Sequence, residues 1–153
     1  MSCNIALLAA GGAVLAAETA LTGEQAFALI RPPGHHASRN FRWGFCWFNN
    51  MAIAVQKMIH EDQIQSALIL DIDLHFGDGT DAIFLDRRDV TYLHMDEVDT
   101  LSQDLEFINA CDLIGISAGF DRHIHDWGGF MTTEEYYEVG KQVGTLSMKQ
   151  LTS

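Results

Sequence analysis

The sequence predicts an α/β fold in which helices cover a parallel β-sheet. Expected strands and helices alternate along its 153 residues, which is the order that α/β layered folds produce. The segment 66–73 contains the uninterrupted apolar run Ala67-Leu68-Ile69-Leu70, and a strand without polar alternation is typical of a parallel sheet buried on both faces. No Ser/Gly-rich linker, repeat or low-complexity tract divides the chain. We therefore expect a single domain over residues 1–153.

The N-terminal segment is expected to be a buried helix. Residues 5–21 are rich in Ala and Leu, and Gly23 follows them as a stop signal. The apolar part, Ile5 to Ala17, is too short to span a bilayer. A signal peptide needs a basic start, yet no Lys or Arg precedes Arg31. These features favour a cytoplasmic protein without a membrane partner.

The next elements are a short strand, a loop and a helix. Ala26 to Ile30 is an apolar run cut off by two prolines, which indicates a buried strand. Residues 31–44 are rich in Pro, Gly, Asn and Arg and are expected to be loop. Asn49 can cap a helix from Asn50 to about His60, because the apolar positions of that segment leave Gln56 and Lys57 outside.

The second half of the chain is predicted to add two strands and two helices. Val90 to Leu93 and Leu113 to Ser117 are short apolar strands, and residues 102–110 are expected to be helical. Thr132 opens a further helix, since Glu135 stands at the capping-box spacing. The total of about four strands is small for a sheet of this class.

Composition and charge narrow the functional classes. A hydrophobic fraction of 48% and a charged fraction of 20% are those of a folded globular protein. The net charge of −12 argues against nucleic-acid binding, which needs clustered Lys and Arg. The three cysteines match no zinc-knuckle spacing and leave one unpaired in any disulfide scheme, so buried free thiols are the simplest interpretation.

One group of chemically active residues follows the buried strand. Asp71, Asp73 and His75 alternate, so all three are expected on one face of an extended strand. They stand at its carboxyl end, where open α/β sheets usually carry their sites. Two carboxylates and an imidazole are costly to desolvate unless they bind a cation or pair with histidines. The alternative is a solvated turn that carries acids by chance.

A second strand ends in a similar way. Leu113 to Ser117 runs into Gly119 and then Asp121. With Asp73 and His75, Asp121 completes an oxygen–nitrogen–oxygen set that leaves positions open for water and substrate. Open coordination is typical of a catalytic rather than a structural metal site.

A pair of histidines lies on a Pro-Gly loop. His35 and His36 can bind metal or move protons, although adjacent loop histidines are also common as surface residues. Asp71 and Asp78 can each orient one imidazole and raise its basicity. In the aromatic stretch 41–48, core packing explains most rings. Phe45, next to Gly44, is our candidate for the wall of a substrate channel. The remaining histidines are expected to be structural or exposed: His60, His94, His123 and His125.

Together these segments resemble the histone deacetylase family, especially its bacterial branch of acetoin-utilisation-type and acetylpolyamine amidohydrolases. The resemblance runs to about Tyr137 and includes four motifs in the family's order: Arg31-Pro32-Pro33-Gly34-His35-His36-Ala37, Gly44-Phe45-Cys46-Trp47-Phe48-Asn49-Asn50, Asp71-Ile72-Asp73-Leu74-His75-Phe76-Gly77-Asp78-Gly79-Thr80 and Ser117-Ala118-Gly119-Phe120-Asp121. It implies an arginase/deacetylase-like three-layer α/β/α sandwich with a parallel sheet, here truncated.

The resemblance also implies roles for individual residues. One zinc ion per chain is expected on Asp73, His75 and Asp121, with a potassium ion near Asp71 and Asp73, held partly by backbone carbonyls. His35 and His36 are implied as general base and acid, with Asp71 behind His35 and Asp78 behind His36. The implied reaction is zinc-dependent removal of acetyl groups from a small acetylated amine or an acetyl-lysine substrate.

Several departures from the family pattern qualify this expectation. Typical members are much longer, and the interval from Leu93 to Asp121 is short. Phe76 replaces a second histidine, and nothing after Asp121 resembles the glycine-rich segment that carries the family's catalytic tyrosine. Uncovered apolar faces in a shortened fold favour association, so we expect a homo-oligomer.

Three hypotheses remain open on the sequence. The leading one is a deacetylase-like amidohydrolase of low activity. The second is a degenerate relative that binds metal or an acylated ligand without turnover, because the oxyanion tyrosine is missing. The third is a two-manganese ureohydrolase of the arginase type, which would need another carboxylate two residues after Asp121, where His123 stands.

Overall fold

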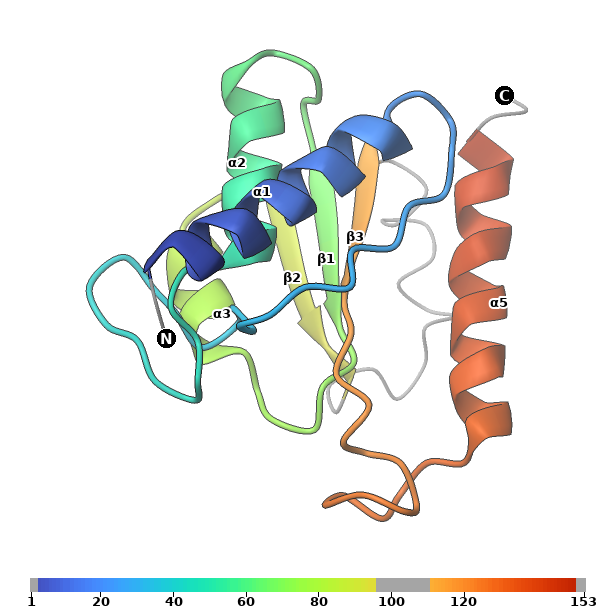
Figure 1. The fold of residues 1–153 in the computed structure, drawn as a ribbon. Helices are drawn as coiled ribbons and strands as arrows, with labels where there is room; N and C mark the ends of the chain where they lie inside the picture. The colour runs from blue at the N-terminus through green and yellow to red at the C-terminus, as the bar shows by residue number, and fades with distance from the viewer. Residues whose placement is uncertain (1–2, 96–110, 151–153) are drawn as a thin grey trace.

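The computed structural model describes residues 3–95 and 111–150, and its centre is a parallel sheet (Figure 1). Three strands, β1 (Ala67–Asp71), β2 (Val90–His94) and β3 (Leu113–Ser117), are arranged in the order β2-β1-β3. All five residues of β1 are buried. These strands and the burial of the central one on both faces confirm the predictions from apolar runs without alternation.

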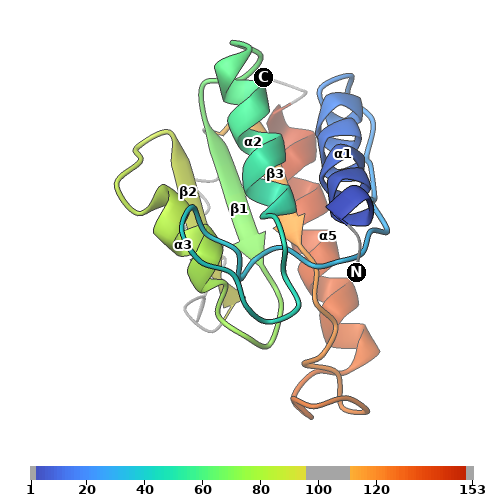
Figure 2. The same cartoon turned by 60° about the vertical axis from the view of Figure 1, so that its left-hand side comes forward.

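Helices cover both faces of the sheet, which gives a three-layer α/β/α arrangement (Figures 1 and 2). On one face lie α1 (Cys3–Ala20), α2 (Asn50–His60) and α3 (Asp78–Phe84), and α5 (Thr133–Gln150) lies on the other. Val55 and Met58 of α2 pack against Ile69 of β1 in the larger core cluster. On the opposite face, Val143 of α5 packs with Leu70 in a smaller cluster.

Both predicted helix caps are present. The Asn49 side chain accepts a hydrogen bond from the backbone N–H of Ala52 at the start of α2. At the start of α5, the Thr132 hydroxyl accepts from the N–H of Glu135, and the Glu135 carboxylate accepts from the N–H of Thr132. Because these side chains satisfy N–H groups that a helix start leaves unpaired, the sequence predicts both helix starts correctly.

The prediction of a buried strand at Ala26–Ile30 is wrong. The segment is irregular, and the side chains of Phe27 and Leu29 are 71% and 90% exposed. A strand needs a neighbour for its backbone hydrogen bonds. Within the described residues, none of the three strands pairs with this segment, so its apolar composition alone does not make it a strand.

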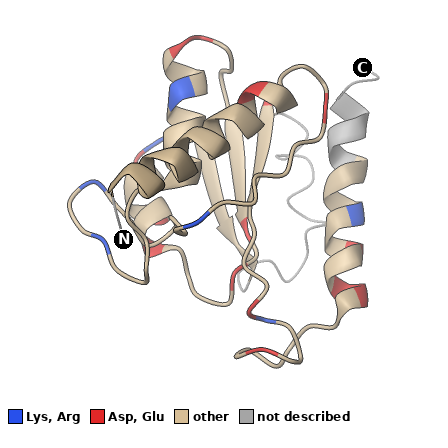
Figure 3. Cartoon of the chain, in the orientation of Figure 1, with Lys and Arg blue, Asp and Glu red and all other residues tan. Residues whose placement is uncertain are grey.

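The N-terminal helix forms as predicted, but most of it is not buried. Its buried residues are small, Ala6, Ala9 and Ala10, whereas Leu8 and Leu15 are 75% and 63% exposed. Glu18 is its single charged residue, and the helix is almost uncharged in Figure 3. By length and composition alone, α1 is long and apolar enough to cross a membrane; core helices and signal sequences meet the same criterion.

The remaining predictions concern residues 102–110 and the three cysteines. The helix expected at residues 102–110 lies outside the described residues. All three cysteines are free, as expected, but only Cys46 and Cys111 are buried and Cys3 is exposed.

Candidate metal centre

The candidate site lies in the loops that follow the carboxyl ends of β1 and β3. In a parallel sheet these ends meet at one edge, and Asp71 is in register with Ser117 of β3 and His94 of β2. Strand β1 stops at Asp71, so the expectation that Asp73 and His75 continue the strand is wrong. A side-chain turn places them instead, because the N–H of Asp73 donates to Asp71 Oδ1 (3.1 Å).

The structure brings Asp73, His75 and Asp121 together in one cluster. His75 Nδ1 lies 3.1 Å from Asp73 Oδ1 and 2.9 Å from Asp121 Oδ2, and one ligand atom of each residue lies within 4.8 Å of the others. The N–H of Leu74 donates to Asp121 Oδ1 (3.0 Å), which ties the two loops together. All three side chains are partly exposed, so the cluster is open to solvent on one side.

This donor set fits a divalent metal. Two carboxylates and one imidazole are ligands that zinc accepts, and donor atoms around a tetrahedral zinc ion lie about 3.3 Å apart. The measured separations around His75 Nδ1 are close to that spacing. Two carboxylates on one imidazole nitrogen also concentrate negative charge that a cation would compensate. Three ligands would leave a position for water or substrate.

His35 is held by a buried carboxylate beside this cluster. Its Nδ1 donates to Asp71 Oδ2 (3.0 Å), and its Nε2 lies 3.9 Å from Asp73 Oδ2. Asp71 is fully buried and also accepts from the Tyr92 hydroxyl (3.1 Å). Burial lowers the pKa of His35, but the hydrogen bond to Asp71 and the charges of Asp71, Asp73 and Asp121 outweigh it. The net effect raises the pKa above 6.5.

His36 has a similar partner on the other side. Its Nδ1 lies 2.7 Å from Asp78 Oδ1, and Trp43 Nε1 donates to the second oxygen of Asp78 (2.8 Å). The His36 ring lies between those of His35 and Trp43, with centroid distances of 4.0 and 4.1 Å. Asp78 is the first residue of α3, so the helix start fixes the carboxylate that orients His36.

Two glycines allow this close packing. A Cβ at Gly44 would clash with the His36 ring, and one at Gly119 would clash with the carboxylate of Asp73. Gly44 also has φ +56°, a backbone conformation that side chains other than glycine rarely adopt. Gly44 therefore lies directly against His36 at the candidate site, and its place in a substrate channel stays a prediction.

Aromatic side chains stand at the open side of the cluster. Phe45 follows Gly44 and is 83% exposed, and the Trp127 ring packs edge-on against His75 with a centroid distance of 6.0 Å. Exposure of Phe45 is compatible with a channel rim. The expectation that core packing explains most of the aromatic stretch is wrong for Phe41 and Trp43, which are 47% and 54% exposed.

Sequence reasoning missed two side chains that support the site from β2. Tyr92 holds Asp71 through its hydroxyl, and His94 is buried with Nε2 3.0 Å from the backbone oxygen of Asp73. The sequence predicts His94 to be structural or exposed, without indicating that it contacts the site. Their position near the carboxyl end of a strand beside β1 was an available signal. Trp43 was assigned to packing, and its hydrogen bond to Asp78 could not be predicted from composition.

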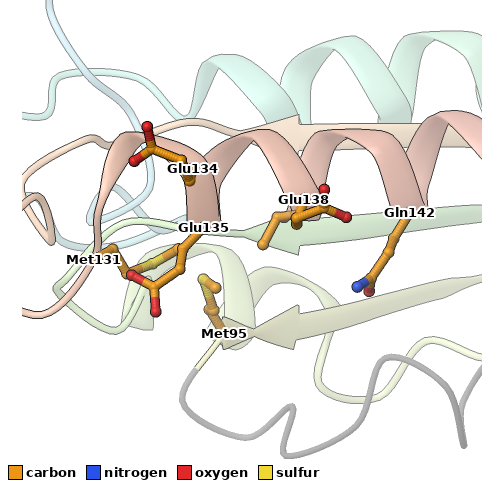
Figure 4. A pocket seen from close by; sticks show the side chains of 7 residues that line it. Met95, Met131, Glu134, Glu135, Glu138 and Gln142 are labelled. Atoms are coloured by element: carbon orange, nitrogen blue, oxygen red, sulfur yellow. The ribbon is translucent and has the colours of Figure 1, made fainter.

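A cavity lies away from the candidate site. About 420 Å³ in volume, it lies between α5 and the end of β2 and is lined by Met95, Met131, Val139 and polar residues of α5 (Figure 4). None of the candidate site residues lines it. It adjoins Met95, after which the chain passes outside the described residues, so we assign it no role.

The fold and the cluster define an α/β protein with a candidate metal site at the carboxyl edge of a parallel sheet. Comparisons with known proteins agree. The family model for the histone deacetylase domain matches residues 1–101. The chain belongs to the histone deacetylase family.

Individual relatives cover the same region. A probable deacetylase of Methanothermobacter thermautotrophicus is 48% identical over 92 residues, 60% of this chain and 28% of that protein. Acetylpolyamine amidohydrolase 2 of Pseudomonas aeruginosa is 47% identical over 75 residues, 49% of this chain and 22% of that protein. The crystal structure of the HDA15 HD domain matches with a TM-score of 0.82 and 29% identity, covering 94% of this chain and 53% of that one. The chain thus spans about a quarter of these curated relatives.

Proposed function

We propose that this chain carries the metal and proton-transfer residues of a zinc-dependent deacetylase, which removes acetyl groups from acetylated amines such as acetyl-lysine or an acetylpolyamine. One observation carries the proposal. Two histidine–aspartate pairs, His35–Asp71 and His36–Asp78, stand directly beside the cluster of Asp73, His75 and Asp121. Relatives named deacetylase and acetylpolyamine amidohydrolase support the reaction class.

The two imidazoles can divide the proton transfers of amide hydrolysis. Each has Nδ1 engaged by a carboxylate, at 3.0 Å for His35 and 2.7 Å for His36, which leaves Nε2 for the reacting atoms. His35 Nε2 faces the Asp73 carboxylate, so His35 is suited to take a proton from the attacking water. His36 is suited to give a proton to the departing amine.

The remaining residues would bind and orient. Asp73, His75 and Asp121 would hold a zinc ion, which when bound would acidify water and polarise the acetamide carbonyl. Gly44 lets the rim approach His36 closely, and Phe45 and Trp127 offer apolar walls to the linker of an acylated amine. Acetate and a free amine would be the products.

One observation favours a second candidate, a protein that binds metal or ligand without efficient turnover. The chain has three tyrosines, all among the described residues. Tyr92 is bonded to Asp71, the Tyr136 ring stacks on His123, and Tyr137 is 68% exposed. Among the described residues, no hydrogen bond links these hydroxyls to Asp73, His75 or Asp121, although burial and the charges of Asp121 and Asp73 raise the pKa of Tyr136. Lack of one oxyanion donor typically lowers the rate by ~10²–10³.

Acetate release by the zinc-loaded chain tests the proposal. We expect slow release from acetyl-lysine peptides and acetylpolyamines, and faster turnover of an activated acetate ester, which depends less on the missing donor. Asp121→Ala should reduce both rates to background, because it removes a proposed zinc ligand. Asp86→Ala, which changes an exposed acid beyond α3, is the matched control and should leave both rates unchanged. A chain that binds zinc but turns over neither substrate would reject the hydrolase and favour the second candidate.

A further inference from the structure

Arg122 is a buried cation directly behind the candidate metal site. Its side chain is 5% exposed, and among the residues whose burial is described it is the only buried lysine or arginine. Its Nε donates to the backbone oxygen of Asp73 (3.0 Å), and its Nη2 lies 3.3 Å from His94 Nε2. The positively charged guanidinium therefore contacts the main-chain carbonyl of Asp73, a proposed zinc ligand.

The backbone around Arg122 is held by neighbouring residues of the same loop. The N–H groups of Phe130 and Met131 both donate to the Arg122 carbonyl (3.0 and 2.8 Å). Gly128 approaches Arg122 so closely that a Cβ there would lie 2.7 Å from its Cα. Because the backbone of Arg122 is held in this way and its side chain is buried, the guanidinium is part of the folded loop after Asp121. A surface arginine, by contrast, can move away from its partner.

The residues present do not fit the potassium ion that the family resemblance implies near Asp71 and Asp73. Such an ion would need backbone carbonyl oxygens as ligands. The Asp73 oxygen is already contacted by Arg122 Nε and His94 Nε2, each at 3.0 Å, and a carbonyl oxygen has two lone pairs. A potassium ion at this oxygen would also lie next to a buried guanidinium charge, and like charges in a buried site repel strongly.

We propose that the guanidinium of Arg122 replaces the monovalent cation in this chain, so that the site needs no potassium. Arg122 is a positioning residue: it holds the Asp73 carbonyl and offsets part of the charge of Asp71, Asp73 and Asp121. The inference rests on hydrogen bonds and burial within the chain. It stands whether or not the chain hydrolyses acetyl groups.

The direct test is the thermal unfolding of the metal-free chain in different salts. Midpoints are compared in potassium chloride and in choline chloride at equal ionic strength, since choline is too large for a site of carbonyl oxygens. We expect equal midpoints, because Arg122 occupies the Asp73 carbonyl at which potassium would otherwise bind. A saturable rise of the midpoint in potassium alone would overturn the proposal.

A variant provides the converse test. Arg122→Met keeps the length of the side chain but removes its charge and donors. It should have a lower midpoint in choline chloride and recover about 2–4 °C in potassium chloride, as a cation takes the vacated place. Arg87→Met also removes one arginine, but from the surface pair with Asp89, and its midpoint should not respond to potassium.

The outcomes of the variant are decisive in both directions. If Arg122→Met folds and shows no response to potassium, the position is not a cation position and the proposal is wrong. If Arg122→Met does not fold, Arg122→Gln is measured in its place, and the wild-type comparison remains decisive. Because every sample lacks zinc, failure of the proposed hydrolase activity would leave these results unaffected.

Discussion

At His35, burial and the nearby carboxylates have opposite effects on the pKa of the imidazole. Burial lowers the pKa, and the hydrogen bond to Asp71 together with nearby carboxylates raises it further than burial lowers it. The balance depends on Asp71, which is fully buried and held by Tyr92. The protonation of His35 therefore reports directly whether the buried carboxylate is present and ionised.

We predict that the imidazole of His35 in the metal-free chain titrates above 6.5, and that Asp71→Asn moves the midpoint below 6.5. The substitution removes the dominant negative partner and leaves the burial. NMR of histidine ring signals measures both midpoints, with His60, an exposed histidine at the end of α2, as the internal control. Equal midpoints in the two proteins would contradict the assigned pair.

The same shift has a consequence for stability. Because the pKa of His35 is raised on folding, the folded chain binds this proton more tightly than the unfolded chain. The contribution of His35 to the free energy of unfolding is therefore complete below about pH 6.5 and is lost as the pH rises through the folded pKa. This statement applies to the metal-free chain, since a bound cation would oppose protonation of His35.

At the scale of residues, the sequence motifs predict which side chains pair better than they predict the backbone conformation. The pairs His35–Asp71 and His36–Asp78 were predicted from the family pattern and from the need to orient an imidazole. The strand alternation proposed for Asp73 was wrong, because its N–H bonds to the Asp71 side chain and not to a neighbouring strand. Arg122 was not predicted, since a charged residue after Asp121 gives no sign that it turns inward.

At the scale of elements, Asn49 links α2 to the loop that carries the histidines. Its Oδ1 caps the helix by accepting from Ala52 N–H, and its Nδ2 donates to the Ala37 carbonyl and to the Thr80 hydroxyl. All of these contacts are buried. The cap could be predicted from sequence, whereas the long-range bonds of the amide group could not.

We predict that Asn49→Ala lowers the free energy of unfolding by about 1.5–5 kcal/mol. Loss of the cap costs about 0.5–2 kcal/mol, and a buried acceptor left without a donor costs about 1–3 kcal/mol. Urea denaturation followed by circular dichroism measures the change. Glu135→Ala, which breaks an exposed capping box at α5, is the control and should cost about 0.5–1 kcal/mol. Similar losses for the two variants would argue against the long-range role of Asn49.

Strands with a partner in the described chain were predicted well, and the apolar segment without one was not. The apolar runs of β1, β2 and β3 pair in one sheet, and each was predicted within two residues. Ala26–Ile30 is equally apolar but has no strand beside it within the described residues. The short helix α3 was not predicted, because Gly79 and Thr80 disfavour a helix, and its position depends on packing that brings Thr80 N–H to the His35 carbonyl.

At the scale of the whole molecule, α1 and the connection that follows it expose several large apolar side chains. Leu8 and Leu15 of α1 and the nearby connection with Phe27 and Leu29 are all more than 60% exposed. Exposed large apolar side chains favour association when they lie close together. The net charge of −12 makes copies of the chain repel one another. At 0.1–0.15 M salt, this repulsion is largely screened beyond about 8–10 Å.

We therefore predict that the chain self-associates and that added salt strengthens the association. Sedimentation velocity over a range of protein and salt concentrations measures it. Leu8→Gln combined with Leu29→Gln should weaken association without a change in charge, whereas Leu85→Gln, at an exposed position after α3, should not. A chain that remains monomeric at high protein concentration and high salt would contradict the prediction.

The proposed metal centre holds one zinc ion where the loops after β1 and β3 meet. A crystal structure of the zinc-loaded chain, with anomalous data collected at the zinc absorption edge, tests it most directly. We predict one anomalous peak per chain, about 2.0–2.2 Å from atoms of Asp73, His75 and Asp121. A peak bound by other residues, two metal ions at this edge of the sheet, or no peak in a chain loaded with zinc would contradict the account.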